Sequence, residues 1–208
     1  MNPLKIVHCA NFSESKYGAV YYAIDRKISN GLIRNGHFVY DFSYREVAKN
    51  STFFKSKKFG VQTAKHALLE TLKNIEPDLL LLGHSELITL ETLRTAKELY
   101  PQMKIAMWWV DWIYNLNNIL ERLELIDHFF ITTDPKELQQ TNLHQKLYEK
   151  CSYLPNICDT SIDTCKAFEN KNYEFDLLFI GRYDKEREKF IDFLKHSFSH
   201  LKLGFFGL

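Results

Sequence analysis

The stretch that decides the fold is Pro77–His84, which reads PDLLLLGH. Four consecutive leucines leave this segment without a polar face, and such strands are typical of a parallel sheet that is covered by helices on both sides. Pro77 disfavours a helix directly before it, so the preceding helical pattern ends there. The sequence therefore predicts a buried strand over residues 78–83.

Similar apolar runs occur on either side of this strand, and helical patterns separate them. We expect further strands at residues 4–9, 37–42, 104–110 and 128–132, and helices at 17–34, 62–75, 90–99 and 115–125. This alternation predicts a doubly wound, Rossmann-like α/β fold with a parallel sheet. Right-handed crossovers place all strand-to-helix loops of such a sheet at one edge, where ligands bind.

The pattern changes after Leu154-Pro155-Asn156. The following residues are polar and lack convincing periodicity, until Phe175–Ile180 (FDLLFI) predicts a new strand. One helix and one further strand follow before residue 208. We therefore expect a Rossmann-like domain, a linker and an incomplete second α/β unit, at residues 1–156, 157–174 and 175–208.

Composition excludes several classes of function. The 208 residues are 45% hydrophobic, and 27 Lys and Arg against 26 Asp and Glu leave a net charge of +1. No global basic field exists to bind nucleic acid. The apolar runs are far too short to span a membrane, and the N-terminus lacks a signal-peptide pattern. We expect a cytoplasmic protein whose membrane contact is at most peripheral, at the inner face. The loop with Lys55, Lys57 and Lys58 could contact a membrane surface or a phosphorylated acceptor, and the alternative is that these lysines are simply solvated.

Familiar cofactor and metal motifs are missing from the chain. It contains no GxxxxGK[ST], GxGxxG, GxSxG or HExxH sequence, which argues against P-loop, standard dinucleotide, α/β-hydrolase and zincin chemistry. Cys151, Cys158 and Cys165 are spaced by seven, without the close pairs and histidines that zinc sites use. We predict neither a cofactor nor a metal site.

Several short segments occur in a recognisable order along the chain: NGH at 35–37, PDLLLLGH, WWVD at 108–111, DHFFITT at 127–133, YLPN at 153–156 and FIGRYDKERE at 179–188. Taken together, these segments resemble the GT-B glycosyltransferases, and most closely the spore-maturation, CgeB-like group and its family 4 relatives. The match of FDLLFIGR to the strand that opens the donor domain is the most specific.

This resemblance implies an acceptor-binding first domain and the start of a domain that holds a nucleotide-sugar. The implied activity is transfer of a sugar from that donor to a saccharide or glycan acceptor, as in polysaccharide biosynthesis. The donor half ends after its first strand–helix–strand, so a partner chain that supplies the rest is also implied. The alternative is a non-catalytic α/β module that binds a partner or a small ligand.

The candidate catalytic residues are Asp111 and His84, which follow two of the predicted strands. A carboxylate or an imidazole there could deprotonate an acceptor hydroxyl. The alternatives are a helix N-cap for Asp111 and a structural role for His84. Candidate acceptor-binding residues in the neighbouring loops are Ser15, Tyr17, Gly18, Glu86 and Trp112.

The candidate donor-phosphate site follows the strand of the second unit. The resemblance places Gly181 and Arg182 near the donor diphosphate, with Lys185 and Arg187 as helpers. A guanidinium suits this task because its planar fork matches phosphate oxygens. The alternative is the solvated start of a charged helix.

Overall fold

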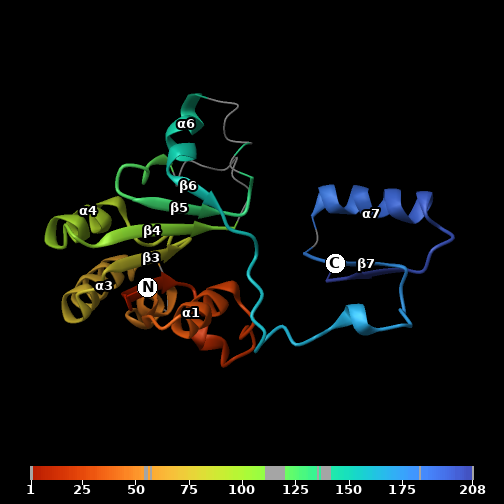
Figure 1. Cartoon of the computed structure of the whole chain (residues 1–208), viewed down its shortest axis with the longest axis horizontal. Helices are drawn as coiled ribbons and strands as arrows, with labels where there is room; N and C mark the ends of the chain where they lie inside the picture. The colour runs from red at the N-terminus through yellow and green to blue at the C-terminus, as the bar shows by residue number, and fades with distance from the viewer. Residues whose placement is uncertain are drawn as a thin grey trace. The chain divides into compact units, whose positions relative to one another are not determined.

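The computed structural model describes residues 2–53, 56, 58–110, 120–134, 136, 142–182 and 184–207 of the chain (Figure 1). The chain forms two compact units, Met1–Asp163 and Thr164–Leu208.

The first unit is built on a six-stranded sheet in which all paired strands are parallel. The strands are β1 (Lys5–Ala10), β2 (Phe38–Ser43), β3 (Leu79–Gly83), β4 (Lys104–Trp109), β5 (His128–Ile131) and β6 (Cys151–Tyr153). Their order is β2-β1-β3-β4-β5-β6. The expected doubly wound α/β fold is confirmed.

Helices cover both faces of this sheet, as PDLLLLGH predicts. They are α1 (Ile24–Arg34), α2 (Tyr44–Asn50), α3 (Val61–Ile75), α4 (Leu90–Leu99) and α6 (Asn142–Glu149). Side chains of α2, α3, α4 and α6 pack on one face with Leu80 and Leu82, whereas α1 packs on the other face with Leu81. The leucines of β3 therefore alternate between two cores.

The aromatic residues that end β4 follow the same alternation. Trp109 lies in the core with α3 and α4, and Trp108 lies in the core with α1. Both side chains are buried. Both tryptophans therefore serve packing in this structure.

The first helix is shorter than expected. The sequence pattern suggested residues 17–34, but α1 begins at Ile24. Tyr17 and Gly18 have φ angles of 50° and 88°, which a right-handed helix cannot contain. Residues 14–16 form a short 3-10 helix, η1 (Glu14–Lys16), and turns lead from there to α1.

Residues 157–163, which have no clear periodicity in the sequence, belong to the first unit. The buried Asp159 carboxylate accepts hydrogen bonds from Asn30 (2.9 Å) and Arg34 (2.8 Å) of α1. Lys27 forms an ion pair with Asp163 (2.7 Å). Three side chains of one helix therefore fix this segment.

The second unit contains β7 (Leu177–Ile180), α7 (Lys185–Ser197) and β8 (Leu203–Phe206), after a 3-10 turn, η3 (Ala167–Glu169). The two strands are parallel, and α7 buries Ile191 and Leu194. Leu178, Ile180 and Phe206 stay largely exposed. In the described residues, this strand–helix–strand lies where the sequence pattern predicts it.

Candidate functional site

The strand order changes direction at β1, which lies between β2 and β3. A crevice at such a switch point, outside the carboxyl ends of the strands, is where doubly wound sheets bind ligands. The loops that follow β1 and β3 meet there, as the sequence predicts. Ionisable side chains gather around this point from β1, α1, β2, α2 and the loop after β3: His8, Asp25, Arg26, Asp41, Arg45 and Glu86.

Asp25 lies in the first turn of α1 and reaches over the end of β3. A Cβ atom at Gly83 would lie 2.5 Å from Asp25 Oδ1, so glycine is what allows this approach. The Asp25 side chain is 17% exposed. Burial raises its pKa to about 6; the charge of Arg45 opposes this rise, and the charge of Asp41 adds to it. A carboxyl that titrates near neutrality is suited to acid–base chemistry.

A chain of hydrogen bonds runs behind Asp25. Ser29 Oγ lies 2.8 Å from His8 Nδ1 and donates to Asp41 Oδ1 at 2.5 Å. Arg26 forms an ion pair with the same Asp41 carboxylate. Burial, helped by the charge of Arg26, lowers the pKa of His8 to about 3, so its imidazole is neutral. Asp41 and His8 are register partners in β2 and β1.

Glu86, a predicted acceptor-binding residue, is held in a second network. It accepts hydrogen bonds from the hydroxyl of the buried Tyr44 and from Arg45 Nε, the latter at 2.8 Å. Burial raises the pKa of Glu86, but the hydrogen bonds from Tyr44, from its own backbone amide and from Arg45 outweigh burial, so the resulting pKa lies below its ordinary value. Glu86 is therefore a fixed anion that can accept hydrogen bonds from a ligand.

His84, a predicted catalytic residue, directly follows β3, and its backbone conformation is strained. His84 and the next residue, Ser85, have φ angles of 55° and 44°. Such conformations are costly for residues with a Cβ and are found mostly at functional sites. The imidazole stacks on Trp109 with ring centres 4.4 Å apart, and Ser85 Oγ donates to the Cys9 carbonyl at 2.7 Å. These contacts fix His84 at the switch point.

The first loop forms a pocket of about 420 Å³ beside this cluster. Phe12, Gly18, Tyr21 and Arg26 contribute to its wall. The Arg26 guanidinium lies 4.8 Å from the centre of the Phe12 ring. Of the other predicted residues of this loop, Ser15 donates a hydrogen bond to Glu46 (3.3 Å), and Tyr17 is 97% exposed.

Two predicted site residues, Asp111 and Trp112, lie outside the described residues. The same holds for Lys55 and Lys57 of the basic loop.

The predicted donor-phosphate residues lie around the start of α7 in the second unit. Arg182, Lys185 and Arg187 are exposed. However, the Asp184 carboxylate caps the helix and accepts hydrogen bonds from the Glu186 and Arg187 amides, at 3.1 and 2.8 Å. Arg187 also pairs with Asp184 and donates to the Arg182 carbonyl. A bound phosphate would have to replace this internal carboxylate.

This arrangement predicts the effect of removing the carboxylate. We expect Asp184→Ser to strengthen the binding of inorganic pyrophosphate about fivefold, because a charge at a helix N-terminus is worth about 1 kcal/mol. Serine also caps helices, so the stability of the unit should change little. Calorimetric titration measures the affinity, with Asp192→Ser as the charge-matched control on the same helix. Equal affinities of the two variants would contradict a phosphate site here.

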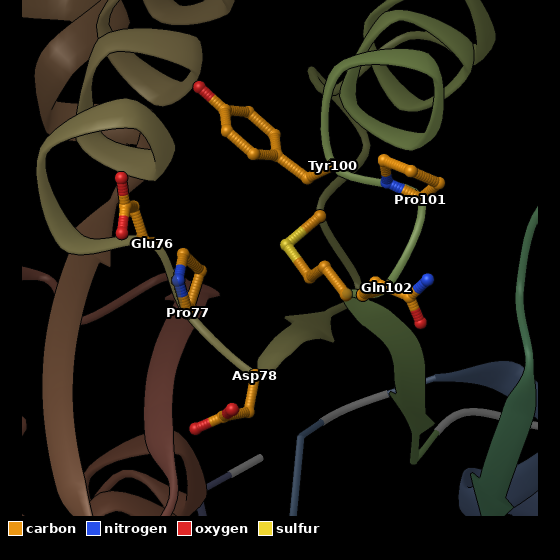
Figure 2. A pocket seen from close by; sticks show the side chains of 7 residues that line it. Glu76, Pro77, Asp78, Tyr100, Pro101 and Gln102 are labelled. Atoms are coloured by element: carbon orange, nitrogen blue, oxygen red, sulfur yellow. The ribbon is translucent and has the colours of Figure 1, made fainter.

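Two other hollows lack such a cluster. A hollow of about 350 Å³ lies between the loops that precede β3 and β4. Glu76 and Pro77 line one side of it, and Tyr100 and Pro101 lie across from them (Figure 2). It lies at the edge opposite the switch point, and its Asp78 carboxylate already accepts the Lys5 amide. The other hollow, about 330 Å³, lies between α1 and the sheet and is almost entirely apolar.

Sequence reasoning missed the central members of the site. Asp25 was not considered because it fell in the middle of the longer helix expected at 17–34. His8 was not considered because it fell within an apolar strand. Arg45 belongs to α2, a short helix that was not expected. One available signal was the position of Asp25 after the first strand-to-helix loop, since that loop lies at the ligand-binding edge.

Neither a protein-family model nor a curated protein sequence matches this chain. Within the described part of the chain, no group of three or more His, Cys, Asp or Glu side chains is placed to hold a metal ion. None of the helices formed by those residues has an apolar stretch that would reach across a lipid bilayer.

Proposed function

We propose that the chain is part of a cytoplasmic glycosyltransferase and that its first unit binds the saccharide or glycan acceptor. The observation that carries the proposal is the 420 Å³ pocket of the first loop, which adjoins the acid–base cluster at the β1/β3 switch point. The resemblance of the chain to GT-B enzymes also implies that the first unit binds the acceptor.

The chemistry of the pocket suits a sugar. Saccharides pack their C–H faces on aromatic rings and exchange hydrogen bonds with charged side chains. Tyr21 and Phe12 offer the rings, and Arg26 offers a planar set of donors. Glu86 and Asp25 supply acceptors close by, and either Asp25 or His84 can take up the proton of an acceptor hydroxyl.

The second unit would begin the donor side of the enzyme. It supplies Arg182 and Lys185 for the diphosphate of a nucleotide-sugar, which is a substrate and needs no further cofactor. A two-stranded parallel sheet with an exposed apolar face is too small to stand alone. We therefore propose that further α/β elements from a partner chain complete the donor side.

Ligand-detected NMR with a panel of mono- and oligosaccharides tests the acceptor role. We expect at least one saccharide to bind with a Kd of about 1 mM, and Tyr21→Ala to weaken it about tenfold, because one stacking ring is lost. Tyr153→Ala, which removes a similarly exposed tyrosine from β6, is the matched control.

Failure of every saccharide to bind, or equal losses in the two variants, would contradict the proposal. Saccharide binding without transfer, measured after a donor half has been supplied, would favour the non-catalytic binding module instead.

A further inference from the structure

Two buried polar atoms at the switch point face each other without a hydrogen bond. His8 Nε2 and Asp25 Oδ1 are 3.9 Å apart, and neither has a hydrogen-bond partner among the residues that the structure describes. The His8 ring is fully buried. Unsatisfied polar atoms are rare in protein interiors, so two of them side by side require an explanation.

The hydrogen-bond chain behind His8 determines which imidazole nitrogen carries the proton. Ser29 donates its hydroxyl hydrogen to the Asp41 carboxylate, so its oxygen can only accept from His8. Nδ1 of His8 is therefore the protonated nitrogen. Because the ring is neutral, Nε2 presents a lone pair to Asp25.

An ionised Asp25 would place a second acceptor against this lone pair. A proton on Oδ1 removes the conflict, because the carboxyl group then points a donor at Nε2. A closer approach of about 1 Å would turn the contact into a hydrogen bond of ordinary length. One proton thus satisfies both buried atoms.

We propose that Asp25 is the acid–base residue of this site, and that His8, Ser29 and Asp41 position its proton. In its neutral form the Asp25 carboxyl donates a hydrogen bond to His8 Nε2. In its ionised form the carboxylate accepts a proton from a ligand hydroxyl. In that step the ligand O–H bond breaks, an O–H bond forms on Asp25, and the electron pair stays on the ligand oxygen. The identity of the ligand as a saccharide rests on the proposed function.

Several other ionisable groups surround Asp25 at the switch point. On β1, His8 is neutral and burial raises the pKa of the Cys9 thiol to about 12. Asp41 of β2 is paired with Arg26 of α1, and burial raises the pKa of Asp41 against the opposing effects of the Ser29 hydrogen bond and the Arg26 charge. Arg45 of α2 stays cationic, since its pKa lies above its ordinary value.

The structure makes this assignment testable without any sugar. Carbon-13 NMR of the aspartate carboxyls in the whole chain should show Asp25 titrating near pH 6. Nitrogen-15 NMR of His8 should show a protonated Nδ1 throughout and an Nε2 signal that shifts with the Asp25 titration. Asp25→Asn places an amide donor at the same position and should make the Nε2 signal independent of pH.

Ser29→Ala separates a positioning role from simple packing. It removes the acceptor for Nδ1–H, so we expect the His8 ring to lose its single tautomer and the Asp25 midpoint to move. The matched control, Ser161→Ala, removes a hydroxyl that bonds Asp159 and should leave the Asp25 titration unchanged.

A midpoint of Asp25 near 4, or titration of His8 near 6.5, would overturn the assignment. If a saccharide binds, its transfer should fall about tenfold for each pH unit below 6 in the wild type and lose this slope in Asp25→Asn. A slope that persists in the variant would also overturn the assignment. Loss of saccharide binding with an intact Asp25 titration would instead contradict only the proposed function.

Discussion

Replacing Gly60 with alanine should destabilise the first unit by at least about 3 kcal/mol, an effect at the upper end for overpacking. Gly60 precedes α3, and an added Cβ would lie only 1.8 Å from the Ala48 carbonyl oxygen. The overlap is with backbone atoms of α2, so no side-chain rotation can relieve it. Urea unfolding followed by circular dichroism measures the loss.

Gly31→Ala is the matched control for this prediction. Gly31 lies inside α1, and an added Cβ there would meet no atom within 4 Å. Alanine favours a helix over glycine by about 0.5–1 kcal/mol, so the same substitution should stabilise the unit. Destabilisation of similar size by both variants would contradict the close contact between α2 and Gly60.

Asp25→Asn should be more stable than the wild type at pH 8, and the difference should disappear below about pH 4. The folded state raises the pKa of Asp25 from 3.8 to about 6, so the folded state binds the proton more tightly than the unfolded chain. The wild type therefore loses stability as the pH rises from about 4 to about 6. Above pH 7 the full difference is on the order of 3 kcal/mol.

Urea unfolding of the wild type and of Asp25→Asn between pH 4 and pH 8 measures this difference directly. The contributions of the other carboxyl groups are the same in both proteins and cancel when the two stabilities are subtracted. Asp163→Asn is the control with the opposite sign. The Lys27 hydrogen bond lowers the pKa of Asp163, so the native carboxylate adds stability above its unfolded pKa. Acidification therefore removes a stabilising contribution at Asp163, whereas at Asp25 it removes a destabilising one. A stability difference for Asp25→Asn that does not depend on pH would contradict a raised pKa.

The sequence by itself determined the architecture of the first unit. PDLLLLGH required a strand with two buried faces, and its neighbours repeated the strand–helix alternation. Parallel strands need helical crossovers of one hand, so the fold class and the ligand-binding edge both followed. The strand–helix–strand of the second unit followed from the same pattern. These features depend on the periodicity of apolar residues, which can be read from short segments of the sequence.

Only the tertiary structure decided which polar side chains meet. His8, Asp25 and Asp41 are separated by a loop and a helix, and they converge because β1 and β2 pair in a register that aligns His8 with Asp41. The start of α1 at Ile24 then directs Asp25 over Gly83. A shift of one residue in a strand turns each of its side chains to the opposite face, and small rotations of a helix redirect its carboxylates. Apolar periodicity does not specify these long-range pairings, because many of them bury the same apolar area.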